Sequence, residues 1–144
     1  FMDINLTSMF LITRAVIPQM RTRGGGRIVN LASVAGRSIS EISALHYSTA
    51  KSAVLGFTRK LAYEEGPNNI TVNSVAPGTV FTERVETRYR ALPQNEQDKR
   101  MDEIPLKRAA RPDEIAAAIL FLASDDASYI TGAAIDVNGG RFMS

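Results

Sequence analysis

The order of helical and strand-like patterns is the feature that most restricts the fold of this chain. Apolar side chains recur at helical spacing in three long segments, and short β-branched runs bounded by glycine, proline or serine lie between them. Such alternation is typical of an α/β fold, an open parallel sheet with crossover helices. The predicted order is helix 2–22, strand 27–33, helix 46–65, strand 70–76, a charged insert 79–110 with helical propensity at 83–92 and 96–104, a helix from Pro112, and strand 133–137.

Composition excludes several classes of function. The 144 residues carry 17 Lys and Arg against 15 Asp and Glu, and this net charge of +2 is too small to indicate binding to nucleic acid or to an anionic membrane. Without cysteine there is no disulfide framework and no thiolate metal site, so we expect a cytoplasmic protein without a metal. The longest apolar run, 115–123, is too short to span a bilayer.

Tyr47 and Lys51 form the first candidate for catalysis. They are four residues apart on a predicted helix, so both side chains lie on one face. A phenol has a pKa of about 10, and a nearby ammonium favours the phenolate. Reaching neutral pH requires a shift of about 3 units, or about 4 kcal/mol, so further cationic help is expected. An isolated Tyr-x-x-x-Lys pattern is nevertheless more often simple surface packing.

Two other segments converge on the same place. Ser33 ends one predicted strand, and Pro77-Gly78 ends the next, followed by the hydroxyl-bearing segment 79–82. Because parallel strands end at one edge of the sheet, and ligands bind at that edge, these groups are expected to face one cleft. The simpler interpretation of Ser33 is a cap of the turn that follows the strand.

In these segments the sequence resembles the short-chain dehydrogenase/reductase family. The resemblance covers essentially the whole chain and implies a three-layer, Rossmann-like, doubly wound parallel sheet. The matching segments are Asn5 in the first helix, 26–33, 47–51, 73–82, 112–116 and 130–140.

The resemblance implies a role for each catalytic candidate. Tyr47 would be the acid-base that protonates a carbonyl oxygen or deprotonates an alcohol. Lys51 would assist Tyr47 and bind the ribose hydroxyls of a nicotinamide cofactor, NAD or NADP. Ser33 would hydrogen-bond the substrate oxygen, and Asn5 would hold a water in a proton relay behind Lys51. Without the resemblance, Asn5 is more simply a helix-entry residue.

The segment after the second strand is implied to contact the cofactor. By the same resemblance Pro77 and Gly78 would frame the nicotinamide, with the backbone of Val80 and the hydroxyl of Thr82 near its carboxamide. The charged insert that follows is expected to be a solvated lid over the substrate.

The family's glycine-rich phosphate turn has no counterpart in this sequence. By resemblance, residues 1–144 are the C-terminal catalytic part of a single Rossmann-like domain whose N-terminal dinucleotide-binding half is absent. The residue that selects NAD or NADP would lie in that half.

The leading hypothesis is an oxidoreductase that transfers a hydride between NAD(P)(H) and a secondary alcohol/ketone pair, such as a 3-oxoacyl thioester or a sugar or polyol. The alternative is a non-catalytic dinucleotide sensor or scaffold on the same fold, although such a protein has no need of Ser33, Tyr47 and Lys51. We also expect a homotetramer or dimer, because Leu11, Val16 and Leu55 lie off the core-facing stripes of the long helices. By resemblance these helices pair across a two-fold axis.

Overall fold

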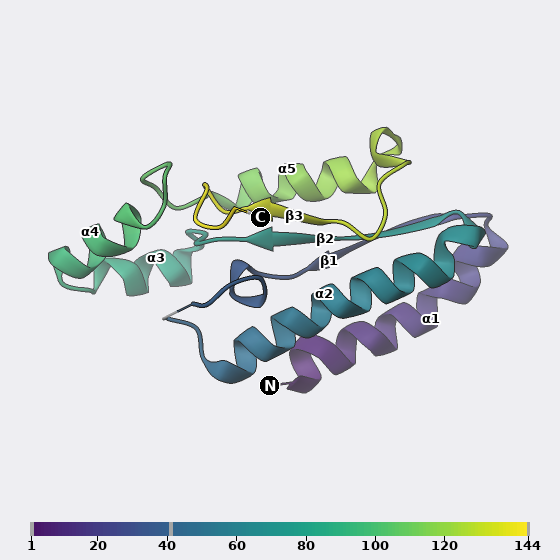
Figure 1. Cartoon of the computed structure of the whole chain (residues 1–144), viewed down its shortest axis with the longest axis horizontal. Helices are drawn as coiled ribbons and strands as arrows, with labels where there is room; N and C mark the ends of the chain where they lie inside the picture. Colours follow the sequence, from purple (N-terminus) through teal and green to yellow (C-terminus); the bar gives the residue numbers. More distant parts are fainter. Residues whose placement is uncertain (1, 41, 144) are drawn as a thin grey trace.

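A computed structural model describes residues 2–40 and 42–143 and has the expected α/β architecture (Figure 1). In chain order the elements are a π-helical turn (Asp3–Thr7), α1 (Ser8–Thr22), β1 (Gly26–Leu31), a 3-10 turn (Val34–Gly36), α2 (Leu45–Glu65), a 3-10 turn (Gly66–Asn68), β2 (Ile70–Pro77), α3 (Glu83–Arg90), α4 (Gln94–Asp102), α5 (Pro112–Ala123), a 3-10 turn (Asp125–Ala127) and β3 (Ala134–Val137).

The three described strands form one parallel sheet in the order β1-β2-β3. Figure 1 shows α1 and α2 on one face and α5 on the other, which is the expected three-layer arrangement. The central strand β2 is buried along nearly its whole length because both its faces are covered. All three strands end at the same edge, where α3 and α4 also lie.

Apolar residues on β2 join the helical layers to the sheet. On the α1/α2 face, Val72 packs with Ile17 and Leu61, and on the α5 face Val75 packs with Leu122. Pro112 starts α5 at a first-turn position, and the side chain of Glu114 accepts a hydrogen bond from the Arg111 amide at 2.8 Å. These contacts fix where each strand ends and therefore where the loops emerge.

Two buried polar groups fix neighbouring segments to this core. Asn73 is fully buried, donates to the Ile130 carbonyl at 2.7 Å and accepts from the Ala133 amide at 3.0 Å. Glu65 is only 2% exposed, and its carboxylate accepts hydrogen bonds from the guanidinium of Arg21. This contact holds the pKa of the Glu65 carboxyl below its usual range. The first group sets the path into β3, and the second joins α1 to α2.

Apart from shifts of one or two residues at other element ends, three details differ from the sequence-based expectations. The predicted strand 27–33 ends at Leu31, because Ser33 begins a 3-10 turn. The first turn of the predicted helix 2–22 is π-helical. Leu55 was expected off the core stripe and is instead 7% exposed and packed with Val54, because the apolar face of α2 is wider than one stripe. Leu11 and Val16 are exposed, as expected.

We expect Leu122→Ala to lower the free energy of unfolding by about 2–5 kcal/mol, since it leaves a cavity between α5 and β2. Leu120 on the same helix is 72% exposed, so Leu120→Ala is the matched control and should change stability by no more than about 0.5 kcal/mol. Urea unfolding of both variants checks this. Equal losses in the two variants would contradict the packing described here.

Candidate active site

Ser33 lies at the start of a tight turn where β1 leaves the sheet. The residue is only 8% exposed, and its Oγ accepts a hydrogen bond from the Ala35 amide at 3.2 Å. The Gly36 amide donates to the Ser33 carbonyl at 2.9 Å and closes the turn. The capping role of Ser33 is therefore real. It uses a lone pair of the hydroxyl, so the O–H remains available as a donor.

Gly36 presses this turn against the backbone of α2. A Cβ at Gly36 would lie 2.5 Å from the carbonyl carbon of Lys51 and 2.7 Å from the Ser52 amide nitrogen. Both distances are too short for a nonbonded contact, so only glycine fits here. The hydroxyl of Ser52 also donates to the Gly36 carbonyl at 3.0 Å. The turn and α2 thus pack as one unit, which sets how closely Ser33 approaches the side chains on α2.

Tyr47 and Lys51 share one face near the start of α2, as the spacing predicted. The Lys51 Nζ donates to the Leu31 carbonyl at 2.8 Å and lies 5.8 Å from the centroid of the Tyr47 ring. Burial lowers the pKa of the Lys51 ammonium. The bond to Leu31 anchors Lys51 at the end of β1, and an ammonium keeps two more hydrogens for other acceptors.

Asn5 belongs to the π-helical turn that leads into α1. Together with Lys51 and the residues of β1, it lines a cavity of about 390 Å³ along the outer edge of that strand. The structure therefore brings Asn5 and Lys51 to one cavity. Its helical position was expected, and the π-helical turn was not, although such turns are frequent at functional sites.

The segment that begins at the end of β2 packs closely against its neighbours at the same edge of the sheet. A Cβ at Gly78 would lie 2.9 Å from the Cα of Asn138, so this position also needs glycine, and Pro77 pairs with Val137 of β3. Val80 forms a parallel bridge with Ala110.

The hydrogen bonds of this bridge come from the residues on either side of Val80. The Phe81 amide donates to the Ala110 carbonyl at 2.9 Å, and the Ala110 amide donates to the Thr79 carbonyl, also at 2.9 Å. The N–H of Val80 therefore faces away from the bridge. Thr82 caps α3, its Oγ1 accepting from the Val85 amide at 3.4 Å. Backbone and hydroxyl groups are thus presented side by side.

The sequence reasoning missed two groups that shape this site. One is Gly36, to which the sequence alone assigns no role. The other is an ion pair between Arg37, at the end of the Ser33 turn, and Asp136 of β3, with 2.9 Å between Nη2 and Oδ2. The close packing of Gly36 and the distant partner of Arg37 both depend on tertiary structure, so no local pattern signals them.

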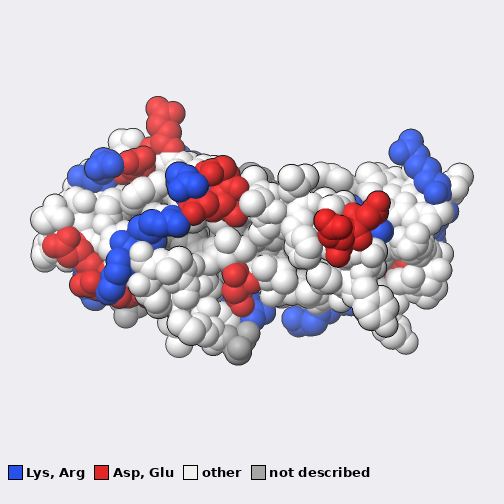
Figure 2. All heavy atoms as spheres, turned by 90° about the horizontal axis from the view of Figure 1, so that it is seen from above, with Lys and Arg blue, Asp and Glu red and all other residues white. Residues whose placement is uncertain are grey.

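Charged groups are mixed on the surface around the site. Figure 2 views the molecule from above relative to Figure 1. At its left end, where α3 and α4 lie, Lys and Arg are interspersed with Asp and Glu. Within residues 2–40 and 42–143 no group of three or more His, Cys, Asp or Glu side chains is placed to hold a metal ion. In the same part of the chain, no helix has the length and apolar composition needed to cross a membrane.

Comparison with known proteins gives a consistent family. A family model described as enoyl-(acyl carrier protein) reductase matches residues 1–141. An acetoacetyl-CoA reductase of Shinella zoogloeoides is 44% identical over 142 residues, which are 98% of this chain and 57% of that protein. A 3-oxoacyl-(acyl-carrier-protein) reductase of Pseudomonas aeruginosa is 42% identical, over 99% of this chain and 56% of its own length. The chain thus spans little more than half the length of these relatives.

Solved structures agree with the sequence relatives. A 3-oxoacyl-(acyl-carrier protein) reductase from Brucella melitensis superposes with a TM-score of 0.89 at 40% identity, over 97% of this chain and 51% of that one. A structure of such a reductase with bound NAD, also from Brucella melitensis, gives 0.86 at 40% identity, over 99% and 50% of the two chains. On its fold and its relatives, this chain belongs to the short-chain dehydrogenase/reductase family.

Proposed function

We propose that this chain is the catalytic part of an NAD(P)-dependent reductase that converts the ketone of a 3-oxoacyl thioester to a secondary alcohol. The observation that carries the proposal is the joint placement of Ser33, Tyr47 and Lys51 on one unit, the turn packed against α2. The names of the relatives favour a 3-oxoacyl thioester over a sugar or polyol.

The residues at the edge of the sheet suit a nicotinamide cofactor. Lys51 has two N–H groups beyond its bond to Leu31, which fit the vicinal hydroxyls of a ribose. The outward N–H of Val80 can donate to the oxygen of the carboxamide, and the hydroxyl of Thr82 can accept from its NH2 group. When bound, the reduced nicotinamide supplies the hydride.

The side chains of this chain supply the proton and the polarisation. The Ser33 hydroxyl donates to the ketone oxygen of the substrate and orients it. Tyr47 Oη gives its proton to the same oxygen as negative charge develops there. The ammonium of Lys51 stabilises the charge left on the phenol oxygen, and a water held by Asn5 returns a proton through Lys51. The reverse sequence oxidises the alcohol.

We propose that further strands of the same protein cover the outer edge of β1. The amides of Gly26 and Ala32 donate to Asn69 and Val75, so the alternate residues between them face the open edge. Apolar side chains line this edge, among them Ile12 at 64% and Leu31 at 52% exposed. A preceding mononucleotide-binding half would supply the missing neighbour and complete a single domain.

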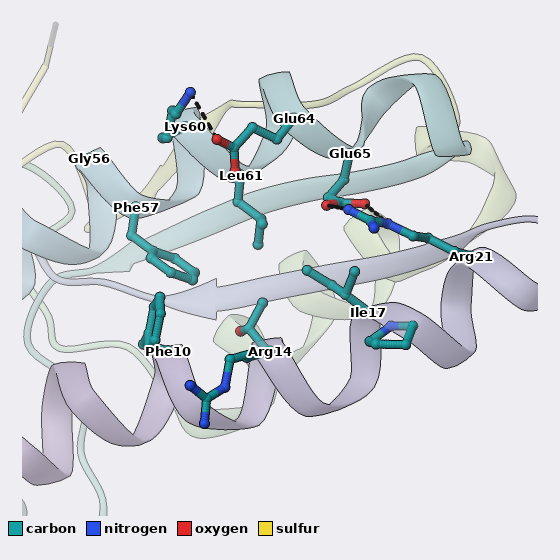
Figure 3. A pocket seen from close by; sticks show the side chains of 12 residues that line it. Phe10, Arg14, Ile17, Arg21, Gly56, Phe57, Lys60, Leu61, Glu64 and Glu65 are labelled. Carbon is teal, nitrogen blue, oxygen red and sulfur yellow. Dashed lines mark hydrogen bonds and ion pairs between the residues drawn. The ribbon is translucent and has the colours of Figure 1, made fainter.

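We also propose that α1 and α2 pair with a second copy of the protein, giving a dimer or tetramer. Between the two helices lies an apolar groove of about 590 Å³, in which Phe10 and Phe57 meet edge to face, with ring centroids 6.2 Å apart (Figure 3). Gly56 lies in the middle of α2 with open space where a Cβ would be. A helix-interior glycine costs about 1 kcal/mol, and close approach of another helix would explain it.

Amide hydrogen exchange tests the strand pairing at β1. In the full-length protein that contains these residues, the amides of Arg27, Val29 and Leu31 should exchange as slowly as that of Ala32, because all would be hydrogen-bonded. Ala32 is the internal reference, since its bond to Val75 exists in this chain alone. Rapid exchange of the three outward amides would rule out a covering strand.

Replacement of the phenol tests the reaction. With acetoacetyl-CoA and NADH or NADPH, Tyr47→Phe in the full-length protein should lower kcat by a factor of about 10² to 10⁴, because the proton donor is lost. Tyr63 on the same helix is 82% exposed, so Tyr63→Phe is the matched control and should retain wild-type turnover. Full activity in Tyr47→Phe would refute the mechanism, and a wild type that binds NAD(P)H without turnover would favour a sensor or scaffold.

Sedimentation equilibrium tests the pairing of α1 and α2. We expect Phe57→Glu to lower the assembly mass at least twofold, since it places a charge in the apolar groove. Tyr63→Glu on the same helix, outside the groove, should leave the mass unchanged. A monomeric wild type, or an unchanged mass in Phe57→Glu, would show that the groove is not the interface.

A further inference from the structure

We propose that Arg37 is a positioning residue, which clamps the Ser33 turn to β3 and to the C-terminal segment so that the Ser33 hydroxyl stays aimed at the substrate oxygen. This inference rests on the proposed function, because it concerns the same hydroxyl. It assigns a role to the ion pair with Asp136, which the chemistry at Tyr47 and Lys51 does not use.

The guanidinium of Arg37 is held on two sides. Its Nη2 lies 2.9 Å from Oδ2 of Asp136, and the two side chains are only 18% and 19% exposed. Its second contact is with the Phe142 ring, whose centroid lies 5.1 Å from the Cζ of Arg37. Because both side chains are largely buried, this pair is screened much less by water and salt than a surface ion pair.

The backbone of Arg37 closes the turn that begins at Ser33. The Arg37 amide donates to the Val34 carbonyl at 2.9 Å, directly after the bond from the Gly36 amide to the Ser33 carbonyl. One side of the turn is therefore fixed by Gly36 against α2, and its far end by the guanidinium against β3. Loss of the far anchor would let the turn rotate about the Gly36 contact and would move Ser33.

The partners of Arg37 are themselves rigid. Asp136 lies in β3 opposite Ala76 of β2. Asn138 accepts from the Gly140 amide at 2.9 Å and donates to the Phe142 carbonyl at 3.1 Å, which fixes the segment that carries the ring. The clamp thus joins the Ser33 turn to the central sheet instead of to another loop.

The energetics favour a positioning role over simple stabilisation. Among the described residues, Nε of Arg37 and Oδ1 of Asp136 are buried without a hydrogen-bond partner. Burial raises the pKa of the Asp136 carboxyl, an effect that Arg37 opposes. A buried pair that is incompletely hydrogen-bonded contributes little net stability, and its best-supported use is to specify one arrangement.

Steady-state kinetics of full-length variants with acetoacetyl-CoA test the clamp. Arg37→Ala should lower kcat about tenfold or more while the KM for NAD(P)H stays within about twofold, because only the substrate oxygen loses a well-placed donor. Asp136→Ala should do the same, and the double variant should be no worse than either single one. Arg37→Lys should restore part of the loss.

Arg27→Ala is the matched control. Arg27 is at the opposite end of β1, its side chain is 19% exposed, and its Nε is likewise buried without a hydrogen-bond partner among the described residues. It should retain wild-type kcat, although it removes the same side chain. A wild-type kcat in Arg37→Ala would overturn the inference, as would an equal loss in Arg27→Ala.

Amide exchange of residues 34–38 separates this inference from the proposed function. Exchange there should be at least about tenfold faster in Arg37→Ala than in wild type, and unchanged in Arg27→Ala. If the wild type reduces no 3-oxoacyl thioester, the proposed function fails, and this exchange result alone decides whether the clamp exists. If Arg37→Ala does not fold, Asp136→Asn gives the same readout, and unchanged exchange in that variant would overturn the clamp.

Discussion

The contact between Gly36 and the backbone of α2 is the constraint on which the rest of the site depends. Ser33 lies in the turn that follows β1, whereas Tyr47 and Lys51 lie on α2, so their separation is set by how closely that turn approaches the helix. Any side chain at Gly36 would overlap the backbone at Lys51 and Ser52. The absence of one Cβ thus lets the turn and the helix pack as one unit that carries all three candidate side chains.

The parallel sheet explains why these groups meet at all. Residues that follow β1 and β2 emerge at the same edge, and α2 begins there because it is the crossover between those two strands. Lys51 joins α2 to β1 directly, since its ammonium donates a hydrogen bond to the Leu31 carbonyl at the end of β1. The proposed acid-base chemistry, substrate orientation and cofactor contacts all depend on one architecture, whose core lies around β2.

The sequence predicted this architecture well because its signals are local. Helical spacing, β-branched runs and glycine or proline boundaries located the sheet, α2 and the edge that gathers Ser33, Tyr47 and Lys51. What it missed depends on distant partners: Asp136 is far from Arg37 in sequence, and the tight fit at Gly36 exists only once α2 is packed. Leu55 was wrongly expected to face outward because a single helical stripe understates burial when α1 and the sheet both cover α2.

A crystal structure of the full-length protein with bound NAD(P)⁺ and a non-reactive 3-oxoacyl thioester tests the central claim most directly. The ketone oxygen of the analogue should lie within hydrogen-bond distance of both Ser33 Oγ and Tyr47 Oη, with Lys51 on the nicotinamide ribose. A ketone oxygen bound away from these hydroxyls, or a Tyr47 directed out of the cleft, would contradict it.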